Sequence, residues 1–144
     1  MITHVVYFTR SGTSQRVAQQ LAQQLNLPLV TVTDNHNWKG FIGFIKGGFY
    51  SSNNKAVKIT TSEPLTNHDE LIVVSPLWAG GVAPAIRQLL TKIPSNQVHL
   101  VVTSNGSTIK QREGYRSVSD IVRNQNHQDQ VISQLVNKVT KAES

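Results

Sequence analysis

The stretch that decides the fold of this chain is Val5-Val6-Tyr7-Phe8-Thr9-Arg10-Ser11-Gly12-Thr13-Ser14-Gln15-Arg16-Val17-Ala18. It opens with four apolar residues, Val5 to Phe8, whose β-branched and aromatic side chains are typical of a strand buried on both faces. From Ser14 onward, apolar residues recur at the spacing of one helix face, at Val17, Ala18, Leu21, Ala22 and Leu25. We therefore expect a buried strand, a tight loop and then a helix.

The expected loop carries four hydroxyl side chains around Gly12, and they belong to Thr9, Ser11, Thr13 and Ser14. A loop that opens a helix presents backbone N–H groups and the positive end of the helix dipole, so it is suited to holding a phosphate. Gly12 lets the backbone turn tightly and approach the anion. The alternative is an ordinary turn in which a serine or threonine caps the helix. The loop by itself leaves both interpretations open.

Composition restricts the class of protein. A chain of 144 residues is expected to form a single domain, residues 1–144, with one sizeable core. The chain contains no cysteine, which excludes disulfides, thiolate catalysis and cysteine-ligated metals. No apolar run approaches the roughly 20 residues that span a bilayer, and no signal peptide is visible. We expect a cytoplasmic protein that does not bind membranes.

The net charge of +6 indicates an attraction to anions. The basic residues are spread singly from Arg10 to Lys141, without the clusters and interleaved aromatic residues that nucleic-acid binding favours. We therefore expect a solvated basic surface and no specific nucleic-acid binding, with an acidic partner protein as the alternative meaning of the charge.

The rest of the chain alternates between strand and helix patterns. Apolar runs predict strands at 27–33, 71–74 and 98–103, a small extended piece at 56–59, and a last strand at 115–122. Helices are expected after Pro84, weakly at 108–113, and finally through Val131, Ile132, Leu135, Val136 and Val139. The segment Trp38–Tyr50 is rich in glycine and aromatic residues and is a poor helix.

Alternating strands and helices favour a parallel sheet with helices on both faces. In such sheets, ligands bind beyond the carboxyl ends of the strands. Three loops follow predicted strands directly, at 9–14, 75–81 and 104–107, so we expect all three at one edge of the sheet. This convergence predicts a ligand site at that edge.

These residues resemble the flavodoxin family. Thr9–Ser14 is similar to the phosphate loop of that family, and Val73–Arg87 resembles the loop and helix that lie beside its flavin. Trp38–Tyr50 also looks like a segment of some small bacterial flavodoxin-like proteins, and it is expected to flank the pocket or make a dimer contact. The resemblance implies a doubly wound α/β fold, a three-layer sandwich around a five-stranded parallel sheet of order 2-1-3-4-5.

The resemblance also implies a non-covalently bound FMN. Its phosphate would be held by the first loop, and its ring would lie between the other two, with Trp78 available to stack on it. Burial of Trp78 in the core or at an interface is the alternative. The cofactor-binding residues expected in this way are Thr9, Arg10, Ser11, Gly12, Thr13, Ser14, Pro76, Leu77, Trp78, Ala79, Gly80, Ser104, Asn105, Gly106 and Ser107.

The implied activity is electron transfer, with electrons arriving from a separate reductase and leaving to an acceptor protein or a small acceptor. No catalytic acid–base set and no metal-ligand spacing is visible among the five histidines. A quinone or porphyrinogen oxidoreductase of the same fold, and a flavin-free binding or regulatory module that uses the basic surface, are the alternatives. A homodimer is possible. Both expected flavin loops lack acids, which predicts a less negative low potential than in acidic flavodoxins.

Overall fold

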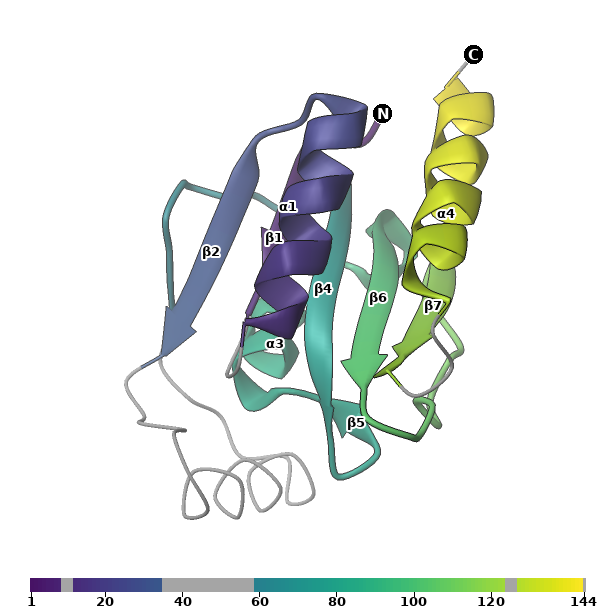
Figure 1. Cartoon of the computed structure of the whole chain (residues 1–144). Helices are drawn as coiled ribbons and strands as arrows, with labels where there is room; N and C mark the ends of the chain where they lie inside the picture. The colour runs from purple at the N-terminus through teal and green to yellow at the C-terminus, as the bar shows by residue number, and fades with distance from the viewer. Residues whose placement is uncertain (9–11, 35–58, 124–126, 144) are drawn as a thin grey trace.

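The computed structural model describes residues 1–8, 12–34, 59–123 and 127–143, which form one α/β unit (Figure 1). The elements in chain order are β1 (His4–Tyr7), α1 (Thr13–Leu25), β2 (Leu29–Asp34), β3 (Ile59–Thr61), β4 (Leu71–Trp78), β5 (Gly81–Val82), α3 (Pro84–Leu89), the short 3₁₀ helix η1 (Ser95–Gln97), β6 (Val98–Ser104), β7 (Ser117–Val122) and α4 (Gln128–Glu143). The segment Trp38–Tyr50 and most of the extended piece expected at 56–59 lie outside the described residues. Within the described part, no helix combines the length and the apolar character that crossing a membrane requires.

The sheet is mixed, which corrects the expected five-stranded parallel arrangement. Its strand order is β3-β2-β1-β4-β6-β7, and β5 pairs with β4 outside this path. The neighbours from β2 to β7 are all parallel, whereas β3 runs antiparallel to β2 and β5 runs antiparallel to β4. The two extra strands are short and carry too few residues to show a strand period in the sequence.

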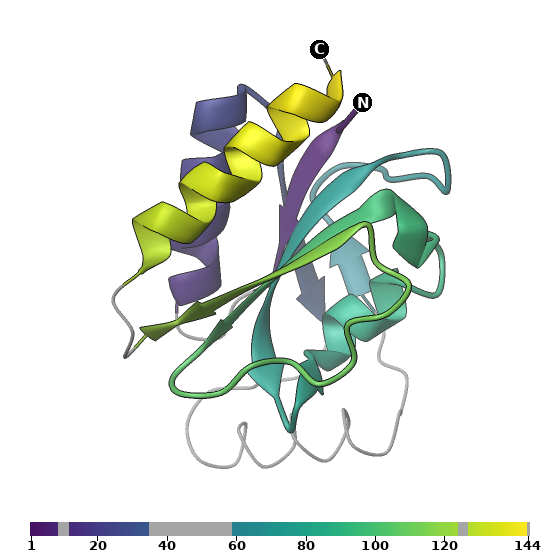
Figure 2. The same ribbon diagram turned by 90° about the vertical axis from the view of Figure 1, so that its right-hand side faces the viewer.

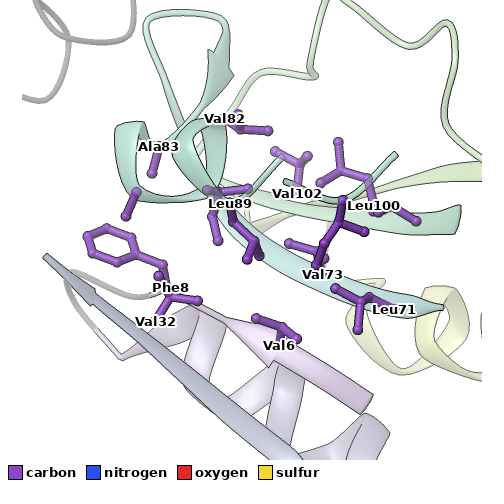
Figure 3. Packing of buried hydrophobic residues seen from close by; sticks show 14 of the residues in the cluster. Val6, Phe8, Val32, Leu71, Val73, Val82, Ala83, Leu89, Leu100 and Val102 are labelled. Carbon is purple, nitrogen blue, oxygen red and sulfur yellow. The ribbon is translucent and has the colours of Figure 1, made fainter. Parts of the chain in front are cut away.

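Helices cover both faces of the sheet and so complete three layers (Figures 1 and 2). On one face, α1 and α4 pack over a cluster of buried residues that includes Val5, Leu21 and Ile132. On the other face, α3 covers a second cluster, in which Val6, Phe8, Val73, Leu89 and Val102 point toward one another (Figure 3). Each fully buried large apolar side chain contributes about 1.5–3 kcal/mol, so both faces stabilise the sheet.

The chain between β4 and β5 differs from the expected loop at 75–81. Strand β4 continues through Trp78, and a two-residue turn at Ala79 and Gly80 reverses the chain into β5. Both turn residues have positive φ, 52° and 82°, which is the conformation that tight hairpins favour. Pro76 lies in this central strand with its missing N–H on the side of β1, where, among the described residues, the last backbone bond is from the Phe8 N–H to the Val74 carbonyl.

The weak helix expected at 108–113 is wrong, because this segment is irregular in the structure. It is fastened to β7 by Asp120, which accepts a hydrogen bond from the Ile109 N–H at 3.1 Å and forms an ion pair with Arg112. Ile109 is buried in the cluster on the α3 face. The connection from β6 to β7 is therefore held in place by one apolar side chain, Ile109, and one carboxylate, Asp120, and not by a helix.

Candidate functional site

The candidate site lies at the edge where the parallel strands end and α1 begins, opposite the two chain termini (Figure 1). Gly12 is the N-cap of α1 in the left-handed conformation, with φ 95° and ψ −10°. Its carbonyl accepts the first helical hydrogen bond, from the Arg16 N–H at 3.1 Å. The first turn of α1 contains no acidic residue, so the positive end of the helix dipole is not offset by a carboxylate there.

The two described hydroxyls of the first loop have different surroundings. Thr13 is half-buried, and its Oγ1 accepts a hydrogen bond of 3.4 Å from Arg16. Ser14 is buried, and its hydroxyl pairs with that of Thr103 at 2.9 Å, which joins the start of α1 to β6. The Ser14 hydroxyl therefore has a partner within the protein. Thr9, Arg10 and Ser11 lie outside the described residues.

The second expected loop contributes mainly its turn. Ala79 is exposed and Gly80 is half-buried, so the turn backbone reaches the surface at this edge. Pro76 and Leu77 are half-buried in β4, and Leu77 packs against the cluster on the α3 face.

Trp78 has only 4% of its surface exposed, and its ring meets that of Phe8 edge to face, with centroids 5.8 Å apart. The indole is thus packed in the core, which was the alternative to stacking on the flavin.

The third loop is open to solvent. Asn105, Gly106 and Ser107 are exposed, and Ser104 is half-buried at the end of β6. The Ser104 hydroxyl donates to the Ser107 carbonyl and closes the loop on itself. The backbone groups of this loop are therefore presented at the same edge as the 79–80 turn and the start of α1.

A cleft of about 420 Å³ lies at this edge between the starts of α1 and α4. Its lining residues are Thr13, Arg16, Ser104, Ile121, Val122, Arg123, His127 and Gln128. Sequence reasoning missed Arg123 and His127, although they follow the last predicted strand and so had to reach the same edge. Among the described residues, no group of three histidine, aspartate or glutamate side chains is placed to hold a metal.

Two carboxylates with bound partners, Asp69 and Glu70, lie at the opposite edge of the sheet. The Thr66 N–H donates to Asp69 at 2.7 Å and lowers the pKa of this carboxyl. The N-terminal ammonium of Met1 and the guanidinium of Arg116 bind Glu70 and lower its pKa. These acids precede β4, so the sheet separates them from the basic carboxyl edge.

Comparison with known proteins gives a fold and no family. No protein-family model matches the chain, and no curated protein matches it either. Among solved structures, the fold is similar to a flavoprotein from Lactobacillus acidophilus NCFM crystallised in complex with FMN, at a TM-score of 0.64 and 18% identity over 90% of this chain and 97% of that one.

Two further structures are candidate flavoproteins from Bacteroides species. The protein of Bacteroides uniformis ATCC 8492 matches with a TM-score of 0.69 and 14% identity, over 90% of this chain and 97% of that one. The protein of Bacteroides eggerthii DSM 20697 matches with a TM-score of 0.70 and 14% identity, over 93% and 95%. The chain therefore shares the fold of these proteins.

Proposed function

We propose that this chain binds FMN non-covalently at the carboxyl edge of its sheet and acts in electron transfer. The observation that carries the proposal is the meeting of the Gly12-capped start of α1 with two surface turns, 79–80 and 104–107, at one edge. The shared fold with a protein crystallised in complex with FMN supports it.

The start of α1 suits the phosphate of FMN. A phosphate monoester carries about 1.5 to 2 negative charges near neutral pH, and the first turn of a helix offers backbone N–H donors and a positive dipole end. Gly12 has no Cβ to obstruct the approach, and Thr13 adds a hydroxyl at the edge of the turn. Arg16, whose Nη1 lies 3.5 Å from where a Gly12 Cβ would be, adds a nearby positive charge.

The two exposed turns suit the flavin ring. The ring is flat and largely apolar with a polar edge, and the backbone of 79–80 and 105–106 would supply donors and acceptors to that edge. When bound, FMN supplies the redox chemistry. The chain positions the flavin and sets its electrostatic surroundings.

The proposed partners are an electron donor and an electron acceptor. No acid–base set for a committed reaction is visible in the sequence, which favours a carrier that receives electrons from a separate reductase and passes them to an acceptor protein or small acceptor. The described residues of both turns contain no carboxylate, so the reduced, negatively charged flavin is less strongly disfavoured than it is beside acids. We therefore propose a less negative low potential.

The visible spectrum of the purified protein tests the proposal. Flavin absorption bands that are released as FMN on denaturation are expected. A colourless protein that does not bind added FMN would contradict the proposal and favour a flavin-free binding module. A redox titration that gives a very low potential for the second electron would contradict the electrostatic part alone.

A further inference from the structure

The cleft between α1 and α4 shares Thr13, Arg16 and Ser104 with the proposed flavin site, whereas Arg123, His127 and Gln128 line the cleft alone. We propose that it binds a phosphorylated small molecule, of the size of a sugar phosphate or a nucleoside monophosphate, in addition to the flavin. None of the residues from 76 to 80 lines this cleft, and its walls come instead from the ends of β6 and β7 and the starts of α1 and α4. It is therefore placed beside the proposed flavin site, on the face of the sheet that α1 and α4 cover.

Positive charge in the cleft has no acidic counterpart. Arg16 lines it from α1 and Arg123 from the end of β7, and none of its lining residues is a carboxylate. Within the described part of the chain, no ion pair is formed by either arginine. Two carboxylates are adjacent in sequence to lining residues: Asp120 forms an ion pair with Arg112, and Asp129, in the first turn of α4, accepts a hydrogen bond from Gln20 at 3.3 Å. Two arginines that face one cleft without a carboxylate favour an anionic ligand.

The chemistry of the side chains favours a phosphate over a simple halide. A guanidinium presents several N–H donors in one plane and binds two oxygens of a phosphate at once. His127 accepts the Val122 N–H at its Nε2, at 3.1 Å, which fixes the ring and leaves Nδ1 as its N–H donor. Arg123, just after β7, and His127, just before α4, thus bring donors to the cleft from outside the proposed flavin site.

The size and the apolar wall of the cleft indicate the rest of the ligand. Ile121 and Val122 form part of the lining and are otherwise buried, with 3% and 2% of their surface exposed. The volume of about 420 Å³ falls in the range of small-molecule sites, roughly 300–1,000 Å³, and near its lower end. A phosphate at Arg123 and His127, with a sugar or nucleoside against the apolar wall, satisfies both parts of the lining.

The test is isothermal titration of AMP into protein saturated with FMN, with adenosine and inorganic phosphate as separate titrants. We expect AMP to bind, adenosine not to bind, and Arg123→Gln to weaken AMP at least about tenfold, the effect of losing one charge-assisted hydrogen bond. The matched control is Lys138→Gln, which removes one positive charge from an exposed position near the other end of α4 and leaves the affinity unchanged. Thermal unfolding verifies that both variants are folded.

Four results would overturn the proposal. The first three are that AMP does not bind, that adenosine binds as tightly as AMP, and that Arg123→Gln binds AMP with the affinity of the parent protein. The fourth is that AMP binds the flavin-free protein but no longer binds once FMN is added. The last result would assign the cleft to the flavin phosphate and leave the proposed function intact. Failure of the proposed function is seen separately, as a protein that does not bind FMN.

Discussion

The buried hydroxyls of Ser14 and Thr103 lie 2.9 Å apart and hydrogen-bond to each other, although the two residues are 89 positions apart in the chain. This bond joins the first turn of α1 to the end of β6, the two elements that carry the start of the helix and the 104–107 loop. It therefore sets the distance between two parts of the candidate site.

Removing either hydroxyl of the Ser14–Thr103 pair should lower the free energy of unfolding, and the two losses should not be additive. Ser14→Ala or Thr103→Val leaves one buried hydroxyl without its partner, which costs about 1–3 kcal/mol of unfolding free energy. The double variant removes both hydroxyls, so its loss should be smaller than the sum of the single losses. Urea unfolding of the parent protein, the two single variants and the double variant measures this coupling. Losses of unfolding free energy that simply add would contradict a direct bond between the two hydroxyls.

Substitutions at Gly12 separate backbone strain from charge. Because the φ of Gly12 is 95°, Gly12→Ala places a side chain in the left-handed region and should cost about 1–2 kcal/mol of stability. Gly12→Glu adds a negative charge where the phosphate is proposed to bind. A like-charge pair about 4 Å apart near a protein surface is worth up to about 4 kcal/mol.

We therefore expect Gly12→Glu to bind FMN at least about a hundredfold more weakly than Gly12→Ala. Fluorescence quenching of FMN on titration with each folded variant measures the two affinities. Equal affinities would place the phosphate away from the start of α1.

Trp78 should matter for stability rather than for flavin binding. The ring is packed edge to face against Phe8, so Trp78→Phe should lose about 1–3 kcal/mol of unfolding free energy through poorer packing. FMN affinity should change by less than about threefold, which is under 1 kcal/mol. Phe8→Leu, which alters the other ring of the same contact, should give the same pattern. A large loss of FMN affinity in Trp78→Phe alone would show that the indole stacks on the flavin.

Acid should destabilise the protein through the carboxyls at the opposite edge of the sheet. The pKa values of Asp69 and Glu70 are lowered in the folded state, from ordinary values of 3.8 and 4.5. The stabilisation they give is present above these ordinary values and is lost as the pH falls through the lower folded pKa values. The free energy of unfolding should therefore decline as the pH falls below about 4.5.

Asp69→Asn and Glu70→Gln should each flatten this decline, as measured by urea unfolding over a pH series. Glu113→Gln, at an exposed turn position, is the charge-matched control and should retain the slope of the parent protein. A slope unchanged in all three variants would contradict this assignment of the acid sensitivity.

The sequence predicts which segments share an edge of the sheet where their position depends on the strand that they follow, and the site proposed there stays a prediction. The Gly12 loop, the 79–80 turn and the 104–107 loop each come after a buried apolar run, and parallel strands bring such loops to one edge. Arg123 and His127 were missed although they follow the last predicted strand, because this position indicates only the edge of the sheet and isolated polar residues do not indicate a cleft. The role expected for Trp78 depended on which side of β4 its ring faces, which a buried strand does not reveal by alternation.

The sequence by itself determined the elements with a strong apolar period, such as the strand at Val5–Phe8, the apolar face of α1 and the final helix. A period of this kind depends only on which side chains of the segment itself are buried. The tertiary structure alone decided the short antiparallel strands β3 and β5, the irregular segment held by Asp120, and the Ser14–Thr103 bond. These features depend on partners far away in the chain. A local pattern records that a side chain is buried, whereas only the folded chain determines which group it meets.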